Sequence, residues 1–119
     1  MQKQKICVIG GGISGLMVAA IIAKSNVRID LIAKNFYTDT VSSRTTAISN
    51  SNYLFLKKSN ILKPNSKLLW ACKKMELYDS FKNLHNSKIL NFNAKKLEDN
   101  ILHIVTNKNL NKALKEKIK

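Results

Sequence analysis

Cysteine, proline and long hydrophobic runs are nearly missing from this chain of 119 residues, which has two cysteines and one proline. Cys7 and Cys72 stand far apart, and neither belongs to a CxxC pair. This excludes a disulfide framework and a zinc ribbon, and it fits a reducing compartment. The longest apolar run, residues 16–23, is well short of the roughly 18 residues that span a bilayer. The glycine-interrupted N-terminus does not have the form of a signal peptide.

Acidic residues are also scarce, with 7 Asp and Glu against 21 Lys and Arg, so the formal net charge is +14. Such a charge is typical of proteins that bind nucleic acids. However, the only arginines are Arg28 and Arg44, whereas recognition of base edges favours arginine. The lysines are spread along the whole chain. We therefore interpret the charge as a general bias towards Lys and Asn, which leaves a weak attraction to anionic lipid headgroups.

The first third of the chain predicts a strand, a helix and a second strand. Residues 5–10 are apolar, β-branched and end at glycine, which predicts a strand buried on both faces. Residues 13–25 have apolar side chains at helical spacing, and residues 27–33 alternate as a strand does. Together they predict a βαβ unit with parallel strands and a right-handed crossover. Cys7, inside the first strand, is expected to be a buried and inert thiol.

The rest of the chain predicts shorter elements. Residues 34–44 are polar and without a clear period, which predicts a loop. The remaining segments predict, in order, a helix from Thr45 or Thr46 to about residue 60, a short helix at 66–72, strands at 74–81, 88–92 and 101–105, and a helix at 107–118.

A glycine-rich motif joins the first predicted strand to the first predicted helix. Gly10, Gly12 and Gly15 satisfy the pattern G-x-G-x-x-G, and the flanking strand and helix are the context that a dinucleotide site requires. The first glycine allows a tight turn, the second lets the backbone approach a pyrophosphate, and the third lets the helix pack close to the strand. Free N–H groups at the helix N-terminus would then face the phosphates. The alternative is a glycine-rich turn without a ligand.

The second strand has no acidic residue where a dinucleotide site normally has one. A carboxylate about 20 residues after the motif usually binds the ribose hydroxyls, and Ala33 occupies that position. Asp30 lies earlier in the strand and faces the opposite side, so we interpret it as a solvated carboxylate. The neighbouring Lys34 leaves NADP as a minor alternative. His85 and His103 are isolated, and we expect no metal site and no catalytic residue in this chain.

Four segments resemble parts of a known enzyme family. They are the motif region ICVIGGGISGLMVAAIIAKS with VRIDLIAK, the arginine-containing stretch SSRTTAISNSNYLFLKKSNIL, the strand MELYDS, and the C-terminal stretch ILHIVTNKNLNKALKEKIK. In this order they resemble the FAD-dependent aromatic-ring monooxygenases of ubiquinone biosynthesis, the UbiH type that includes 2-octaprenyl-6-methoxyphenol hydroxylase.

The resemblance implies a set of FAD contacts. Arg44 would lie beside the flavin and its phosphates, and the turn would hold the pyrophosphate. The cofactor-binding residues implied are Gly10, Gly11, Gly12, Ile13, Ser14, Gly15 and Arg44. Ala33 replaces the glutamate that normally binds ribose in this family, and family members are several times longer. We therefore expect FAD to be weakly held by, or absent from, the isolated chain.

The fold class implied is α/β: a truncated, Rossmann-type FAD-binding βαβ unit with the beginning of a mixed substrate-binding sheet. Residues 1–73 would form the FAD-binding unit and its following helices, residues 74–106 the start of the substrate-binding sheet, and residues 107–119 a helix that returns to the first unit. The function implied is the N-terminal FAD-binding part of a monooxygenase that hydroxylates a polyprenyl-phenol ring, inactive alone.

The resemblance also implies partners and a location. The partners would be the remainder of a split enzyme and, in the full-length family, a polyprenyl-phenol substrate. The protein would be cytoplasmic, with peripheral association at the inner face of the membrane as a further expectation. The alternative from another class is a binding-only module for a nucleotide or, less favoured, for nucleic acid.

Overall fold

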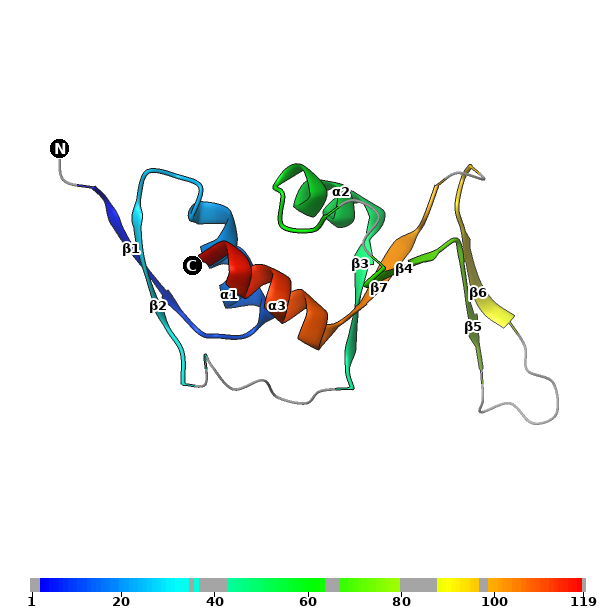
Figure 1. Ribbon diagram of the computed structural model, residues 1–119. Helices are drawn as coiled ribbons and strands as arrows, with labels where there is room; N and C mark the ends of the chain where they lie inside the picture. Colours follow the sequence, from blue (N-terminus) through cyan, green and yellow to red (C-terminus); the bar gives the residue numbers. More distant parts are fainter. Residues whose placement is uncertain are drawn as a thin grey trace.

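The computed structural model describes residues 3–34, 36, 43–63, 67–79, 88–96 and 99–118. Strands and helices alternate along it, which confirms the α/β fold class (Figure 1). The elements are β1 (Lys5–Ile9), α1 (Ile13–Ile22), β2 (Arg28–Ile32), β3 (Thr45–Ser49), α2 (Asn50–Lys58), β4 (Leu69–Cys72), β5 (Lys74–Tyr78), β6 (Lys88–Asn93), β7 (Leu102–Thr106) and α3 (Asn107–Ile118).

The predicted βαβ unit is confirmed, but its sheet is covered on one face only. β1 and β2 are parallel, and Lys5 pairs with Arg28 at one end while Ile9 pairs with Ile32 at the other. The side chains that alternate toward α1 are partly buried, whereas Ile9 is 82% exposed and Ile32 is 57% exposed on the outer face. The prediction of a strand buried on both faces is therefore wrong. Cys7 points to this outer face and is exposed, so its prediction as a buried thiol is wrong too.

A second sheet has the order β3-β7-β4 and is antiparallel throughout. Its two outer strands correct the sequence analysis, which expected residues 45–49 to begin a helix and residues 66–72 to be helical. Residues 45–49 are rich in β-branched side chains, and they pair with β7 along their whole length. The helix begins only afterwards, where Ser49 Oγ accepts a hydrogen bond from the N–H of Asn52.

The third sheet is an antiparallel hairpin of β5 and β6, which projects from the body of the molecule at the right of Figure 1. Both strands were predicted. The third predicted strand, now β7, pairs with β3 and β4 rather than with this hairpin. The predicted division into residues 1–73, 74–106 and 107–119 is not decided by this pairing and stays a prediction.

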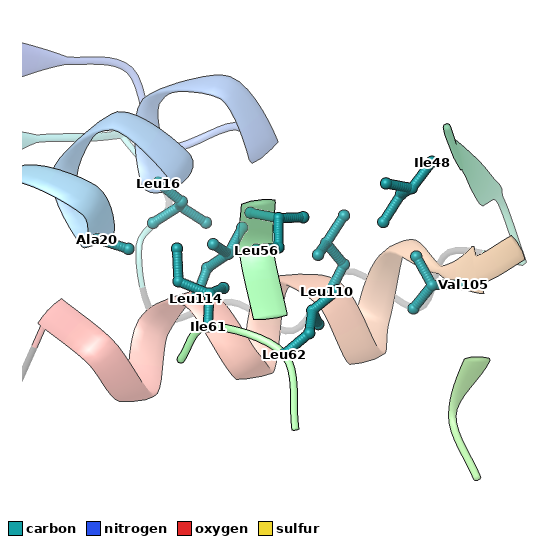
Figure 2. Close-up of a cluster of buried hydrophobic side chains, with 9 residues drawn as sticks. All are labelled: Leu16, Ala20, Ile48, Leu56, Ile61, Leu62, Val105, Leu110 and Leu114. Carbon is teal, nitrogen blue, oxygen red and sulfur yellow. The ribbon is translucent and has the colours of Figure 1, made fainter. Parts of the chain in front are cut away.

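The hydrophobic core lies between the three helices and the β3-β7-β4 sheet. α3 has its predicted bounds, and its buried stripe packs against the buried face of α1. Burial of a leucine side chain stabilises a fold by about 1.5–3 kcal/mol, so this contact binds the two ends of the chain together. Figure 2 shows the buried cluster, formed by Leu16, Ala20, Ile48, Leu56, Ile61, Leu62, Val105, Leu110 and Leu114.

Within the described ranges, no helix combines the length and the apolar character that crossing a membrane requires.

Candidate dinucleotide site at the first turn

The turn between β1 and α1 depends on the backbone conformation of its first residue, Gly10. Gly10 has a φ of +120°, a backbone conformation that side chains with a Cβ rarely adopt. Its N–H donates a hydrogen bond of 2.8 Å to the carbonyl of Ile32, at the end of β2. The turn is therefore fixed to the carboxyl ends of both parallel strands, where α/β sheets bind their ligands.

Two further glycines are required by close packing inside the protein. A Cβ on Gly15 would lie 2.0 Å from the carbonyl oxygen of Gly10, so α1 can approach β1 only with glycine there. A Cβ on Gly11 would lie 2.6 Å from the Cβ of Ala33, at the end of β2. The role predicted for Gly15 is confirmed, and the packing of Gly11 against Ala33 is a contact that the sequence did not indicate.

Gly12 differs from the other three glycines because no described neighbour requires it. Its φ of −74° and ψ of 175° are open to any residue, and a Cβ placed on it has no neighbour within 4 Å. The main chain of Gly12 is therefore exposed to solvent, and beside it is open space that a larger side chain would fill. This is the arrangement that a pyrophosphate needs in order to approach the backbone.

The N-terminus of α1 offers hydrogen-bond donors at the same place. The first helical bond runs from the N–H of Leu16 to the carbonyl of Gly12, so the N–H groups of Ile13, Ser14 and Gly15 have no helical acceptor. No side chain caps the helix, and its first turn has no acidic residue. These N–H groups and the positive end of the helix dipole fit an anionic group such as a phosphate.

The end of β2 has the alanine and the displaced carboxylate that the sequence indicated. Ala33 stands beside Gly11 without a carboxylate. Asp30 is on the outer face of the sheet, where it forms ion pairs with Lys5 at 2.6 Å and with Arg28 at 3.7 Å. The hydrogen bond from Lys5 is the main cause of a lowered pKa at Asp30. Asp30 therefore lies on the outer face of the sheet. It does not provide the carboxylate that a ribose-binding site would have at the position of Ala33.

Arg44 directly precedes β3, and its side chain is exposed. Its carbonyl accepts a hydrogen bond of 2.9 Å from the N–H of Asn107, which fixes this backbone to the start of α3. The start of β3 and the turn between β1 and α1 both lie in the lower part of the molecule as drawn in Figure 1. The predicted contact between the Arg44 side chain and a bound cofactor stays a prediction.

His103 and the hollow of the described structure do not lie at the glycine turn. His103 is buried in β7 and stacks on the ring of Tyr53, with ring centroids 3.9 Å apart. His85 lies outside the described residues. Among the residues that the structure does describe, no three His, Cys, Asp or Glu side chains gather as a metal site would require. A hollow of about 260 Å³ lies beside α3, and its lining residues do not include the glycine turn.

Two solved structures are similar to this chain over 99% of its length. One is the tetrameric form of 2-methyl-3-hydroxypyridine-5-carboxylic acid oxygenase, with a TM-score of 0.66 and 16% sequence identity. The other is 2,6-dihydroxypyridine-3-hydroxylase from Arthrobacter nicotinovorans, with a TM-score of 0.60 and 20% identity. This chain shares their fold. No protein-family model matches the sequence, and no curated protein matches it either.

The shared fold extends over a part of those enzymes only, since the chain spans 29% and 27% of their lengths. The names of both proteins describe oxygenation of a pyridine ring. Neither name concerns a polyprenyl phenol, and the resemblance to the ubiquinone enzymes stays at the level of sequence.

Proposed function

We propose that this chain is the FAD-binding part of a flavin-dependent monooxygenase that hydroxylates an aromatic ring. The observation that most supports the proposal is Gly12, a bare glycine at an uncapped helix N-terminus that packing inside the protein does not require. The fold shared with two pyridine-ring oxygenases supports the reaction class.

In this proposal the turn binds the cofactor through its backbone. The N–H groups of residues 13–15 would donate to the pyrophosphate, Gly12 would give it room, and Arg44 would add a positive charge beside the flavin and phosphates. Bound FAD supplies the oxygen-transfer chemistry. Because Ala33 cannot accept a hydrogen bond from the ribose, the chain alone would hold FAD weakly.

The proposed substrate is the ring of a polyprenyl phenol, as in ubiquinone biosynthesis, and this rests on the sequence resemblance. An enclosed catalytic site would need more polypeptide than the shared fold, which would make the remainder of the enzyme a partner. The proposed location is the cytoplasm, with contact at the inner face of the membrane. The net charge of +14 supports that contact through attraction to anionic headgroups.

The variant Gly12→Val tests the cofactor site. The backbone conformation of residue 12 is open to any residue and a Cβ there meets no neighbour within 4 Å, so we expect Gly12→Val to fold, at a cost of about 1 kcal/mol for the altered N-cap. Its side chain would fill the space that the pyrophosphate needs. We expect amide shifts at residues 10–15 on titration of the parent with FAD, and loss of these shifts in Gly12→Val.

The control is Ala23→Val, which adds the same β-branched side chain at the exposed C-terminal end of α1. This variant should respond to FAD as the parent does. Equal FAD responses in the parent and in Gly12→Val would exclude the turn as the cofactor site. Equal affinity for ADP and FAD would instead favour a binding-only nucleotide module.

A further inference from the structure

The hollow beside α3 reaches the hydrophobic core of the protein. Its volume is about 260 Å³. Its apolar lining includes Ile61, Leu62 and Val105, which are at most 6% exposed, together with Leu69 and Ala113. All of these side chains are aliphatic. A ligand with a short aliphatic body would fit this lining and remove it from water.

The rim of the hollow is strongly basic. Its lining residues include Lys63, which follows α2, and Lys112 and Lys117 on α3, and Glu116 is the one acidic residue among the described lining residues. Within the described part of the chain, none of these three lysines forms an ion pair. Three ammonium groups around an apolar lining favour an anionic group at the mouth.

The helical period of α3 explains how one helix serves both the core and the hollow. Leu110 and Leu114 are one turn apart and point into the core (Figure 2). Asn109, Lys112 and Glu116 follow each other at spacings of three and four, so they form a neighbouring stripe. Two of the three basic side chains of the hollow, Lys112 and Lys117, are thus held on a helix that core packing fixes in place.

From the juxtaposition of an aliphatic lining and a lysine rim, we propose that this hollow binds a small aliphatic carboxylate of about the size of octanoate. The chain of the ligand packs on the core residues, and its carboxylate lies between the lysines of the rim. The site is separate from the glycine turn and does not depend on the proposed cofactor.

Octanoate is the probe, titrated into the full chain labelled with ¹⁵N. We expect saturable amide shifts centred on Leu69, Val105 and Ala113. Octylamine has the same chain with the opposite charge, and butyrate has the same charge with a shorter chain, so both should bind far more weakly. Equal binding of octylamine would overturn the anionic part of the proposal, and equal binding of butyrate would overturn the aliphatic part.

The matched variants separate the rim from the general charge of the protein. Lys112→Gln/Lys117→Gln should weaken octanoate binding about tenfold, because two partly screened charge contacts are lost. Lys57→Gln/Lys58→Gln removes the same charge at the end of α2, outside the hollow, and should change little. Equal weakening by both pairs would overturn the proposal. Gly12→Val should bind octanoate as the parent does. A failure of the octanoate proposal can therefore be told apart from a failure of the proposed cofactor site.

Discussion

Each of the four glycines in the chain has its own structural role in the first turn. Gly10 provides a positive φ, Gly15 and Gly11 allow two backbone segments to approach closely, and Gly12 leaves space open to solvent. The spacing of the motif indicated the turn, the close approach and the open position. It could not indicate the contact of Gly11 with Ala33, because that contact depends on where β2 ends in space.

At the same scale, Ala33→Glu should strengthen binding of adenine nucleotides. The substitution provides a carboxylate at the end of β2, where sites of this type bind ribose hydroxyls. A hydrogen bond to a charged group contributes about 1.5–3 kcal/mol, which corresponds to a gain of about 10- to 150-fold in affinity for ADP or FAD. Titration calorimetry or amide shifts would measure it.

Ala23→Glu is the control for this prediction, since it adds the same charge at the far end of α1. It should leave the affinity for ADP unchanged. If Ala33→Glu raises the affinity for ADP no more than this control does, either the end of β2 does not face the ribose or the cofactor is not an adenine dinucleotide.

At the scale of the elements, β7 is the strand on which most of the second sheet depends. It lies between β3 and β4, and its register places His103 between Ile48 and Ala71. α2 covers the same histidine through Tyr53, and Asn100 approaches its ring at 3.5 Å. Burial lowers the pKa of His103 below its ordinary value of 6.5.

The position of His103 predicts a loss of stability in mild acid. As the pH falls below about 6.5, the unfolded chain gains a proton on His103 that the folded chain does not, so unfolding becomes more favourable. The slope from one such group is at most about 1.4 kcal/mol per pH unit. Urea unfolding at pH 7.5 and pH 5.5 should show a lower midpoint at the acidic pH.

His103→Gln should remove this difference, because Gln does not titrate. The lysines beside Glu76 lower its pKa from 4.5 to about 2, so the stability that this carboxylate contributes is lost only below about pH 4.5, outside the range compared. An NMR titration of the native histidine rings provides an independent check. A pKa of His103 at or above 6.5 would contradict the prediction.

The elements that the sequence did not predict correctly are those that depend on distant partners. The βαβ unit and α3 have strong local periods, and both were predicted. β3 and β4 are short, and β7 pairs with them from 30 to 61 residues away in the sequence. Their residues, such as Leu69 and Ala47, also suit helices, so the antiparallel pairing overrides local preference there.

At the scale of the whole molecule, the chain is extended for its length. The radius of gyration is 18.1 Å and the extents are 66 × 32 × 24 Å, whereas a compact domain of this length has a radius of about 13–14 Å. The βαβ sheet exposes Ile9 and Ile32 on its outer face, and the hairpin exposes Leu77 and Leu90. Exposed apolar faces and strand edges favour association with other strands.

We expect this surface to make self-association depend on salt. The charge of +14 keeps molecules apart at low ionic strength, but at about 0.15 M salt this repulsion is screened within roughly 8 Å. Light scattering should therefore rise between low and moderate salt. Leu77→Gln/Leu90→Gln removes apolar surface without changing the charge and should reduce the rise. A monodisperse monomer at every salt concentration would contradict the prediction.

The packing of α3 on α1 also determines when the protein can fold during its synthesis. Leu16 and Ala20 are made about 90 residues before Leu110 and Leu114, the side chains that bury them. At about 5–20 residues per second, the interval is roughly 5–20 s. Throughout this interval the nascent chain displays the apolar face of its first helix, which makes it a substrate for chaperones that bind such segments.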